Sequence, residues 1–362
     1  CNLRCLYCYG KCCEDIGSSF NFEVDYSIPD EISYDIELLS SFCSKARVGN
    51  LIFYGGEPLL RLDKMKEMMD KVGAERFMVQ TNGLLLDRIE PKYLERLHTI
   101  LVSIDGDEML TDFYRGKGVY KRVIENVKTI REKGFKGEVI ARMTISQQSD
   151  IEAGVKHLLF ECGNIFDSVH WQLDAQFWQS DFNPQVYARW IEESYGPGLL
   201  RLIHLWAKQI TLGRVLRIYP FLGVMETLLG GEEAGLRCGS GWAQYTIQTD
   251  GTIVPCPSMV GLRAYYLGNI RDTDPSDLPE KVDLNPPCST CDMLSICGGR
   301  CLYANITKLW GEEGFRIVCS TVKLLIDGLK CIKPKVETAL KEGVIDSKDL
   351  AYTKFNSCEI IP

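Results

Sequence analysis

The chain begins with three closely spaced cysteines, Cys1, Cys5 and Cys8, in the run Cys-Asn-Leu-Arg-Cys-Leu-Tyr-Cys. Soft thiolates of this kind select zinc or an iron–sulfur cluster. A closed structural zinc site needs a fourth ligand nearby, whereas three thiolates leave one iron of a cubane [4Fe–4S] cluster without a protein ligand. Such an iron is a Lewis acid open to a small molecule. The spacing therefore favours a cluster with one open iron.

A second motif, Phe53–Pro58, has the sequence Phe-Tyr-Gly-Gly-Glu-Pro and follows an apolar run that indicates a buried strand. Its two glycines let the backbone approach a ligand closely, and Glu57 with nearby carbonyls can accept hydrogen bonds from an ammonium. Alone, the motif is a turn before a helix-starting proline. Together with the three cysteines it resembles radical S-adenosylmethionine (SAM) enzymes. In that family the open iron chelates SAM, and an electron from the cluster cleaves SAM to methionine and a 5′-deoxyadenosyl radical. The resemblance assigns the methionine amino group to Gly55, Gly56 and Glu57.

Composition narrows the function classes. A chain of 362 residues fits one barrel plus a smaller domain. Its net charge of −8 argues against a nucleic-acid partner, and no apolar stretch is long enough for a transmembrane helix. Sixteen cysteines in a chain with a full core and cluster-type spacings indicate a reducing, anoxic cytoplasm and not a secreted disulfide scaffold.

Strand and helix patterns alternate as in parallel α/β proteins. Strands are predicted at Leu51–Tyr54, Arg76–Gln80, Ile100–Ile104, Glu138–Thr144 and Ser168–Leu173. Helices are predicted near Asp30–Ala46, Leu62–Val72, Tyr120–Lys133 and Asp150–Cys162. Because the family's first cysteine follows a barrel strand, we expect one more strand upstream of Cys1. The resemblance then implies a partial (β/α)6 radical SAM barrel with its ligand loops at the carboxyl ends of the strands.

Two strand ends carry further candidate SAM contacts. Thr81 and Asn82 precede Gly83, where an ordinary turn is an equally good interpretation. Ser103 and Asp105 offer a hydroxyl and a carboxylate, which suit a ribose. This pair resembles the family's ribose-binding S-x-D pattern.

Two arginines also need an interpretation. Arg142 lies inside an apolar strand, where a buried guanidinium needs a carboxylate partner. That partner is either a protein Asp or Glu or the methionine carboxylate of SAM, and the resemblance favours SAM. Arg115, in Tyr114-Arg115-Gly116, is an alternative ligand of the same kind, but we expect it to lie at the surface.

A second cysteine block lies in the last third of the chain. Its seven members are Cys238, Cys256, Cys288, Cys291, Cys297, Cys301 and Cys319. A zinc ribbon is the alternative for the four at 288–301. In this order, behind a SAM barrel, the seven resemble the SPASM domain, a cysteine-rich module that holds two auxiliary iron–sulfur clusters in peptide-modifying radical SAM enzymes. The resemblance covers about residues 1–322.

The resemblance divides these ligands between two clusters. An outer auxiliary cluster takes Cys288, Cys291, Cys297 and Cys319. An inner one, nearer the barrel, takes Cys238, Cys256 and Cys301. Sulfatase-maturing relatives have another cysteine soon after the first of these, and this chain has none there. The inner cluster therefore keeps an open iron, unless a cysteine from elsewhere or an aspartate closes it.

Candidates for proton or hydrogen transfer are few. Sulfatase maturases carry an aspartate next to the cysteine that corresponds to Cys256, and here Pro257 follows instead. Because proline cannot take a proton, sulfatase maturation is disfavoured. Asp174, at the end of the last predicted barrel strand, is a candidate base. Cys12 and Cys13 are candidate hydrogen donors, with core packing as the alternative.

The predicted organisation has four parts: a radical SAM barrel over 1–182, a helical bridge over 183–235, a SPASM domain over 236–322, and a C-terminal helix and tail over 323–362. The expected cofactors are three [4Fe–4S] clusters and SAM. The expected reaction is an oxidative crosslink, a thioether or a carbon–carbon or carbon–oxygen bond, in a ribosomally made precursor peptide.

A ferredoxin- or flavodoxin-type donor and a separate leader-binding protein are the expected partners. The alternatives are peptide epimerisation, a small-molecule or folded-protein substrate, and a non-catalytic electron carrier.

Overall fold

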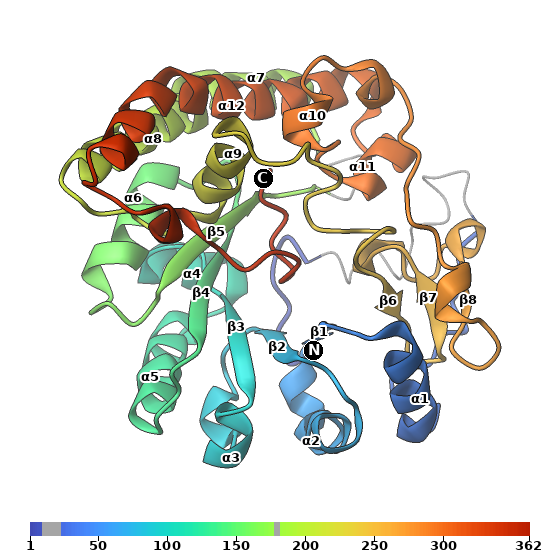
Figure 1. Ribbon diagram of the computed structural model, residues 1–362. Coiled ribbons are helices and arrows are strands. Elements are labelled where there is room, and N and C mark those ends of the chain that lie inside the picture. The colour runs from blue at the N-terminus through green and yellow to red at the C-terminus, as the bar shows by residue number, and fades with distance from the viewer. Residues whose placement is uncertain (9–22, 177–181) are drawn as a thin grey trace.

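A computed structural model describes residues 1–8, 23–176 and 182–362 of the chain. Its first half is built on a parallel sheet whose strands follow one another in chain order (Figure 1). The strands are β1 (Asn50–Phe53), β2 (Arg76–Thr81), β3 (Leu97–Ser103), β4 (Glu138–Ile145) and β5 (Ser168–Leu173). All five strands expected within the chain are present. The strand β3 begins three residues earlier than expected because Leu97 and Thr99 are already buried in the core.

Helices cover the outer side of the sheet, and those that follow β1 connect its strands, as βαβ units require (Figure 1). They are α1 (Ile36–Ala46), α2 (Leu62–Lys71), α3 (Pro91–Leu94), α4 (Glu108–Arg115), α5 (Val119–Glu132) and α6 (Ile151–Lys156), which continues as a π-helical turn over His157–Glu161. The helix α1 begins later than expected because Asp35 caps it, accepting a hydrogen bond from Glu37 N at 3.0 Å. The short helix α4 was not predicted, and it proves central to the site.

The middle of the chain is helical. It contains α7 (Pro184–Trp190), a π-helical turn over Ile191–Tyr195, α8 (Gly196–Thr211) and α9 (Tyr219–Leu228). The long helix α12 (Gly311–Lys341) runs alongside α8 (Figure 1). No helix in the described part of the chain is both long and apolar enough to cross a membrane.

The second cysteine block lies on short elements. These are the antiparallel strands β6 (Thr246–Ile247), β7 (Thr252–Val254) and β8 (Gly268–Asn269), the helices α10 (Leu294–Cys297) and α11 (Leu302–Thr307), and 3-10 turns between them. Strand signals this short have no usable period in sequence, which is why none was predicted.

After α12 the chain returns to the sheet. The tail, residues 352–362, ends in the middle of the molecule near the strands (Figure 1). Asn50 Nδ2 donates to Phe355 O at 3.3 Å, and Asn356 Nδ2 donates to Tyr219 OH at 3.0 Å. Ile360 is also buried. The tail thus belongs to the core and brings its side chains to the strands.

Candidate active site

Cys1 lies against the turn that follows β1. A Cβ atom at Gly56 would come within 3.1 Å of Cys1 N and 3.2 Å of Cys1 Cβ, so glycine permits this approach. From the end of β2, Asn82 Nδ2 donates to Asn2 Oδ1 at 2.7 Å and lies 3.9 Å from Cys1 Sγ. The start of the cysteine loop is therefore held at the carboxyl ends of β1 and β2.

Cys5 and Cys8 form the far side of the same loop. A turn joins them, with Cys8 N donating to Cys5 O at 3.1 Å. Burial raises the pKa of the Cys5 thiol, and the Arg115 guanidinium opposes that rise. Because the thiolate is the metal-binding form, this positive charge favours a metal-ligating state of Cys5.

Glu57 organises the turn from inside the protein. Its Oε1 accepts from Leu59 N at 3.0 Å and from the Thr81 hydroxyl at 2.7 Å, and its Oε2 accepts from Asn82 N at 2.7 Å. Burial raises the pKa of this carboxyl group. The Thr81 hydroxyl also accepts from Gly83 N at 3.0 Å. Glu57, Thr81 and Asn82 thus bind one another and leave the backbone around Gly55 and Gly56 to line the cavity described below.

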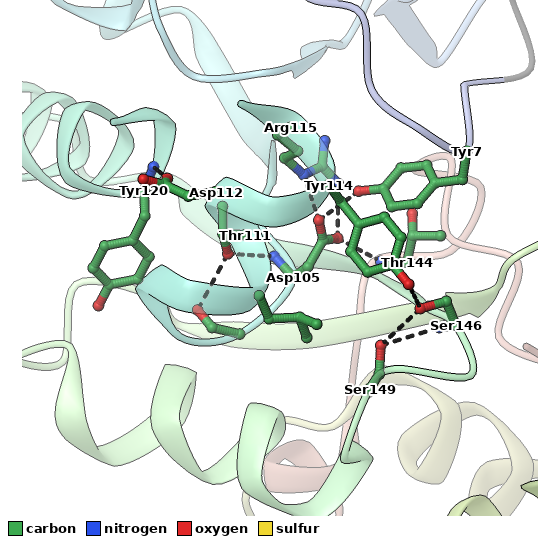
Figure 2. Close-up of polar contacts among 12 residues, drawn as sticks. Tyr7, Asp105, Thr111, Asp112, Tyr114, Arg115, Tyr120, Thr144, Ser146 and Ser149 are labelled. Carbon is green, nitrogen blue, oxygen red and sulfur yellow. Dashed lines mark hydrogen bonds and ion pairs between the residues drawn. The ribbon is translucent and has the colours of Figure 1, made fainter. Parts of the chain in front are cut away.

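The expectation that Asp105 faces a ribose is corrected by the structure. Asp105 is completely buried, and Arg115 binds it through Nε at 2.7 Å and Nη2 at 2.8 Å. Thr144 N and the Tyr7 hydroxyl also donate to its carboxylate (Figure 2). The surface position expected for Arg115 is wrong for the same reason, since its side chain is only 7% exposed. Ser103 is half-buried at the end of β3.

Arg142 has a protein carboxylate as its partner. Its Nη2 lies 3.3 Å from both oxygens of Glu359, which belongs to the tail, and donates to Gln172 of β5. Its Nε is buried with no hydrogen-bond partner among the described residues. The partner left open by the sequence is therefore a glutamate in this structure, and the unsatisfied Nε still points to a missing acceptor.

His170 and Asp174 lie on and just beyond β5. His170 is fully buried, its ring nitrogens have no hydrogen-bond partner in the described part of the chain, and Nε2 is 3.8 Å from Glu359. Burial and the charge of Arg142 lower its pKa well below the usual value. Asp174 is half-buried, and its Oδ1 accepts from Gln176 N at 3.0 Å. Cys12 and Cys13 lie outside the described residues.

The three cysteines assigned to the inner cluster lie near one another. Burial raises the pKa of Cys256, and the charges of Cys301 and Cys238 raise it further. Burial likewise raises the pKa of Cys238 to about 11, with contributions from Glu359 and Cys301. These mutual effects indicate that the three buried thiols lie close to one another.

The four cysteines assigned to the outer cluster form a second group. Its members are Cys288, Cys291, Cys297 and Cys319. Together with Cys301 they line one cavity, between α10 and α12. Burial raises the pKa of Cys297 to about 11, and the charges of Cys319 and Cys288 add to it. Among the described residues, no three Cys, His, Asp or Glu side chains converge as ligands of a single metal ion. The donor chemistry fits iron–sulfur clusters, whose thiolates bind separate irons.

A cavity of about 1740 Å³ extends from the first cysteine loop to the residues that follow Cys256. One wall carries Cys1, Cys8 and the turn Tyr54–Gly56, and another carries Pro257 and Ser258, which follow Cys256. Side chains of α1, β6 and the tail complete the lining.

Tyr7 and Glu359 are the two site residues that sequence reasoning missed. Tyr7 lies between two predicted ligands, so its position was a usable signal. Glu359 is 217 residues from Arg142 along the chain, and no local pattern could have paired them.

Comparison with known proteins agrees with this architecture. Residues 1–153 match the family model described as the Radical SAM superfamily. A cysteine-type anaerobic sulfatase-maturating enzyme of Clostridium perfringens (strain 13 / Type A) is 22% identical over 357 residues, which cover 89% of this chain and 91% of the relative. A probable GTP 3′,8-cyclase of Methanocella arvoryzae is 29% identical over 139 residues, 37% of this chain and 41% of the relative.

Two solved structures share the fold. One is native anSMEcpe with bound AdoMet and Cp18Cys peptide, with a TM-score of 0.62 and 19% identity, covering 92% of this chain and 96% of that one. The other is Streptococcus suis SuiB bound to precursor peptide SuiA, with a TM-score of 0.52 and 17% identity, covering 85% of this chain and 70% of that one.

Proposed function

Because residues 1–153 form a radical SAM domain, this chain is a radical SAM enzyme, and we propose that it introduces an oxidative crosslink into a ribosomally made precursor peptide. The cavity is the observation that carries the proposal. It is lined by Cys1, Cys8 and Tyr54–Gly56 on one side and by Pro257 and Ser258, which follow Cys256, on another. A peptide segment in this cavity would therefore lie between the first cysteine loop and the chain next to Cys256.

We assign three [4Fe–4S] clusters to the three cysteine groups. The donors fit, because soft thiolates gathered in threes and fours select iron–sulfur centres. The first cluster is held by Cys1, Cys5 and Cys8. The inner auxiliary cluster is held by Cys238, Cys256 and Cys301, and the outer one by Cys288, Cys291, Cys297 and Cys319. When bound, the first cluster and SAM supply a 5′-deoxyadenosyl radical that removes a hydrogen atom from the substrate.

The chain's own residues bind and orient the reactants. Backbone around Gly55 and Gly56 faces the cavity beside Cys1 and suits the amino group of SAM. Glu57 acts behind this turn by fixing its shape. Arg142, with its unsatisfied Nε, suits the methionine carboxylate, and Ser103 lies beside it in the sheet register.

The cavity wall that follows Cys256 favours an oxidative reaction of the peptide. Forming the crosslink removes one hydrogen atom from the peptide and then one electron and one proton. Cys256 is adjacent to Pro257 and Ser258 in that wall, so an electron acceptor held there lies close to the peptide. Asp174 stays the candidate base, and Cys12 and Cys13 stay candidate hydrogen donors. A low-potential ferredoxin- or flavodoxin-type donor and a leader-binding protein complete the proposed system.

The similar solved structures support a peptide substrate, because one carries a Cys peptide and the other a precursor peptide. The proposal is tested by anaerobic reconstitution with SAM, a low-potential reductant and cysteine-containing precursor peptides. We expect the product peptide to have lost two hydrogen atoms. Its fragmentation spectrum should show a new bond between two residues. Deuterium uptake from solvent without loss of hydrogen would instead show epimerisation and overturn the crosslink.

A further inference from the structure

The loop between Cys5 and Cys8 is tied to the end of β3 and to α4 by three contacts. The Tyr7 hydroxyl donates to Asp105 Oδ2 (Figure 2). The Tyr7 ring packs on Tyr114, with centroids 4.9 Å apart. The preceding backbone N–H also donates to Tyr114 O, at 2.9 Å. The loop segment between the two predicted cluster ligands Cys5 and Cys8 is thus held against the end of β3 and α4.

Asp105 has no spare capacity for a ligand. A carboxylate offers about four acceptor positions, and four donors occupy them. Arg115 Nη2 and Thr144 N, at 2.8 and 2.9 Å, bind Oδ1. Arg115 Nε, at 2.7 Å, and the Tyr7 hydroxyl bind Oδ2. The Tyr7 hydroxyl therefore completes a closed set of hydrogen bonds.

Stability alone does not account for this arrangement. Removing a carboxylate and a guanidinium from water costs several kcal/mol per ion, and well-packed apolar residues are often at least as stable. The bidentate pair together with Thr144 N instead gives a fixed direction to the one remaining acceptor position. That position holds Tyr7.

We propose that Tyr7, Asp105 and Arg115 are positioning residues that hold Cys5 and Cys8 in place for the first cluster. The proposal rests on the assignment of that cluster under the proposed function. The Arg115–Asp105 pair fixes the acceptor, the acceptor fixes the Tyr7 hydroxyl, and Tyr7 fixes the loop on which both thiols lie.

The same chain offers a matched control at the opposite end of the sheet. Glu138, at the start of β4, accepts from the Tyr219 hydroxyl at 2.8 Å and pairs with Arg217 at 3.3 Å. This is again a carboxylate, an arginine and a tyrosine hydroxyl, but no cysteine of the first loop is attached to it. Removing the Tyr7 hydroxyl deletes its bond to Asp105, whereas removing the Tyr219 hydroxyl deletes the bond to Glu138 and also the one accepted from Asn356 Nδ2, so the control loses at least as much.

The test compares Tyr7→Phe with Tyr219→Phe in the anaerobically reconstituted full chain. Each protein is challenged with an iron chelator in the presence of iodoacetamide, and alkylation of every cysteine is followed by mass spectrometry. In Tyr7→Phe we expect Cys5 and Cys8 to be alkylated several-fold faster than in wild type, with Cys288 and Cys291 unchanged. In Tyr219→Phe we expect wild-type rates throughout.

A second variant, Arg115→Lys, keeps the positive charge and loses the bidentate geometry, and it should show the same selective exposure of Cys5 and Cys8. Equal rates in Tyr7→Phe and Tyr219→Phe would overturn the positioning role. A uniform increase at all cysteines would do so as well, because it would show a general loss of stability. Failure of the proposed function is distinguishable, because then cluster loading would not protect Cys5 and Cys8 even in the wild-type chain.

Discussion

At the scale of single residues, Asp105 and Arg115 form a buried salt bridge near the site. Asp105→Asn keeps the shape of the side chain but leaves the guanidinium buried without a countercharge. Removing one partner of such a pair costs about 3–5 kcal/mol of unfolding free energy. Denaturant unfolding of the metal-free chain measures this loss.

The control for that prediction is Asp63→Asn. Arg61 binds Asp63 with a similar two-point geometry, at 3.2 and 3.0 Å, but both side chains are exposed. Because exposed pairs contribute little, the control should unfold nearly like wild type. A loss in Asp105→Asn no larger than in this control would contradict the burial argument.

His170 makes the fold sensitive to acid. Its pKa in the folded chain is far below the unfolded value of about 6.5. Between these two values the unfolded chain binds a proton that the folded chain does not, so the unfolding free energy falls as the pH falls below about 6.5. In His170→Gln this part of the acid sensitivity should disappear, and thermal melting between about pH 7.5 and 5 measures it. Parallel melting curves for the two proteins would disprove the assignment.

At the scale of elements, the turn after β1 should not tolerate a side chain. In Gly56→Ala the new methyl group would meet Cys1 at 3.1–3.2 Å and displace it. We expect this variant to lose about the iron of one cluster after reconstitution. Gly73→Ala is the matched control, because no atom lies within 4 Å of its added methyl group. Full iron content in Gly56→Ala would show that Cys1 is not held where the structure places it.

The tail competes for Arg142. If this guanidinium binds the SAM carboxylate, Glu359 must yield to it, because both of its oxygens lie 3.3 Å from Arg142 Nη2. Glu359→Gln removes the competing charge and should tighten SAM binding several-fold in equilibrium dialysis. Glu342→Gln, an exposed change just beyond α12, is the control. Unchanged or weaker SAM binding in Glu359→Gln would show that Arg142 serves the tail alone.

Strands of the sheet were predictable because buried parallel strands are continuous apolar runs bounded by turns. The positions of the first cysteines and of the turn after β1 followed from motifs. The role of Asp105 did not, because its partners come from α4, from β4 and from the cysteine loop, and no spacing records such contacts. The contact between Glu359 and Arg142 could not be predicted for the same reason. The local sequence shows where a strand ends, but it does not show which charged residue from elsewhere in the chain contacts that strand end.

At the scale of the whole molecule, the first cysteine loop and the residues that follow Cys256, far apart in sequence, line one cavity. The proposed division of labour gives the first loop to SAM cleavage and the second block to electron acceptance. Ligand changes in the two regions should therefore have different consequences.

The most direct test counts iron and 5′-deoxyadenosine in Cys5→Ala and Cys291→Ala after anaerobic reconstitution and reduction with SAM. Wild type should bind about twelve irons per chain, and each variant about eight. We expect no 5′-deoxyadenosine from Cys5→Ala and continued formation by Cys291→Ala. Loss of 5′-deoxyadenosine in both, or its persistence in Cys5→Ala, would contradict the assignment of SAM cleavage to the first cysteine loop.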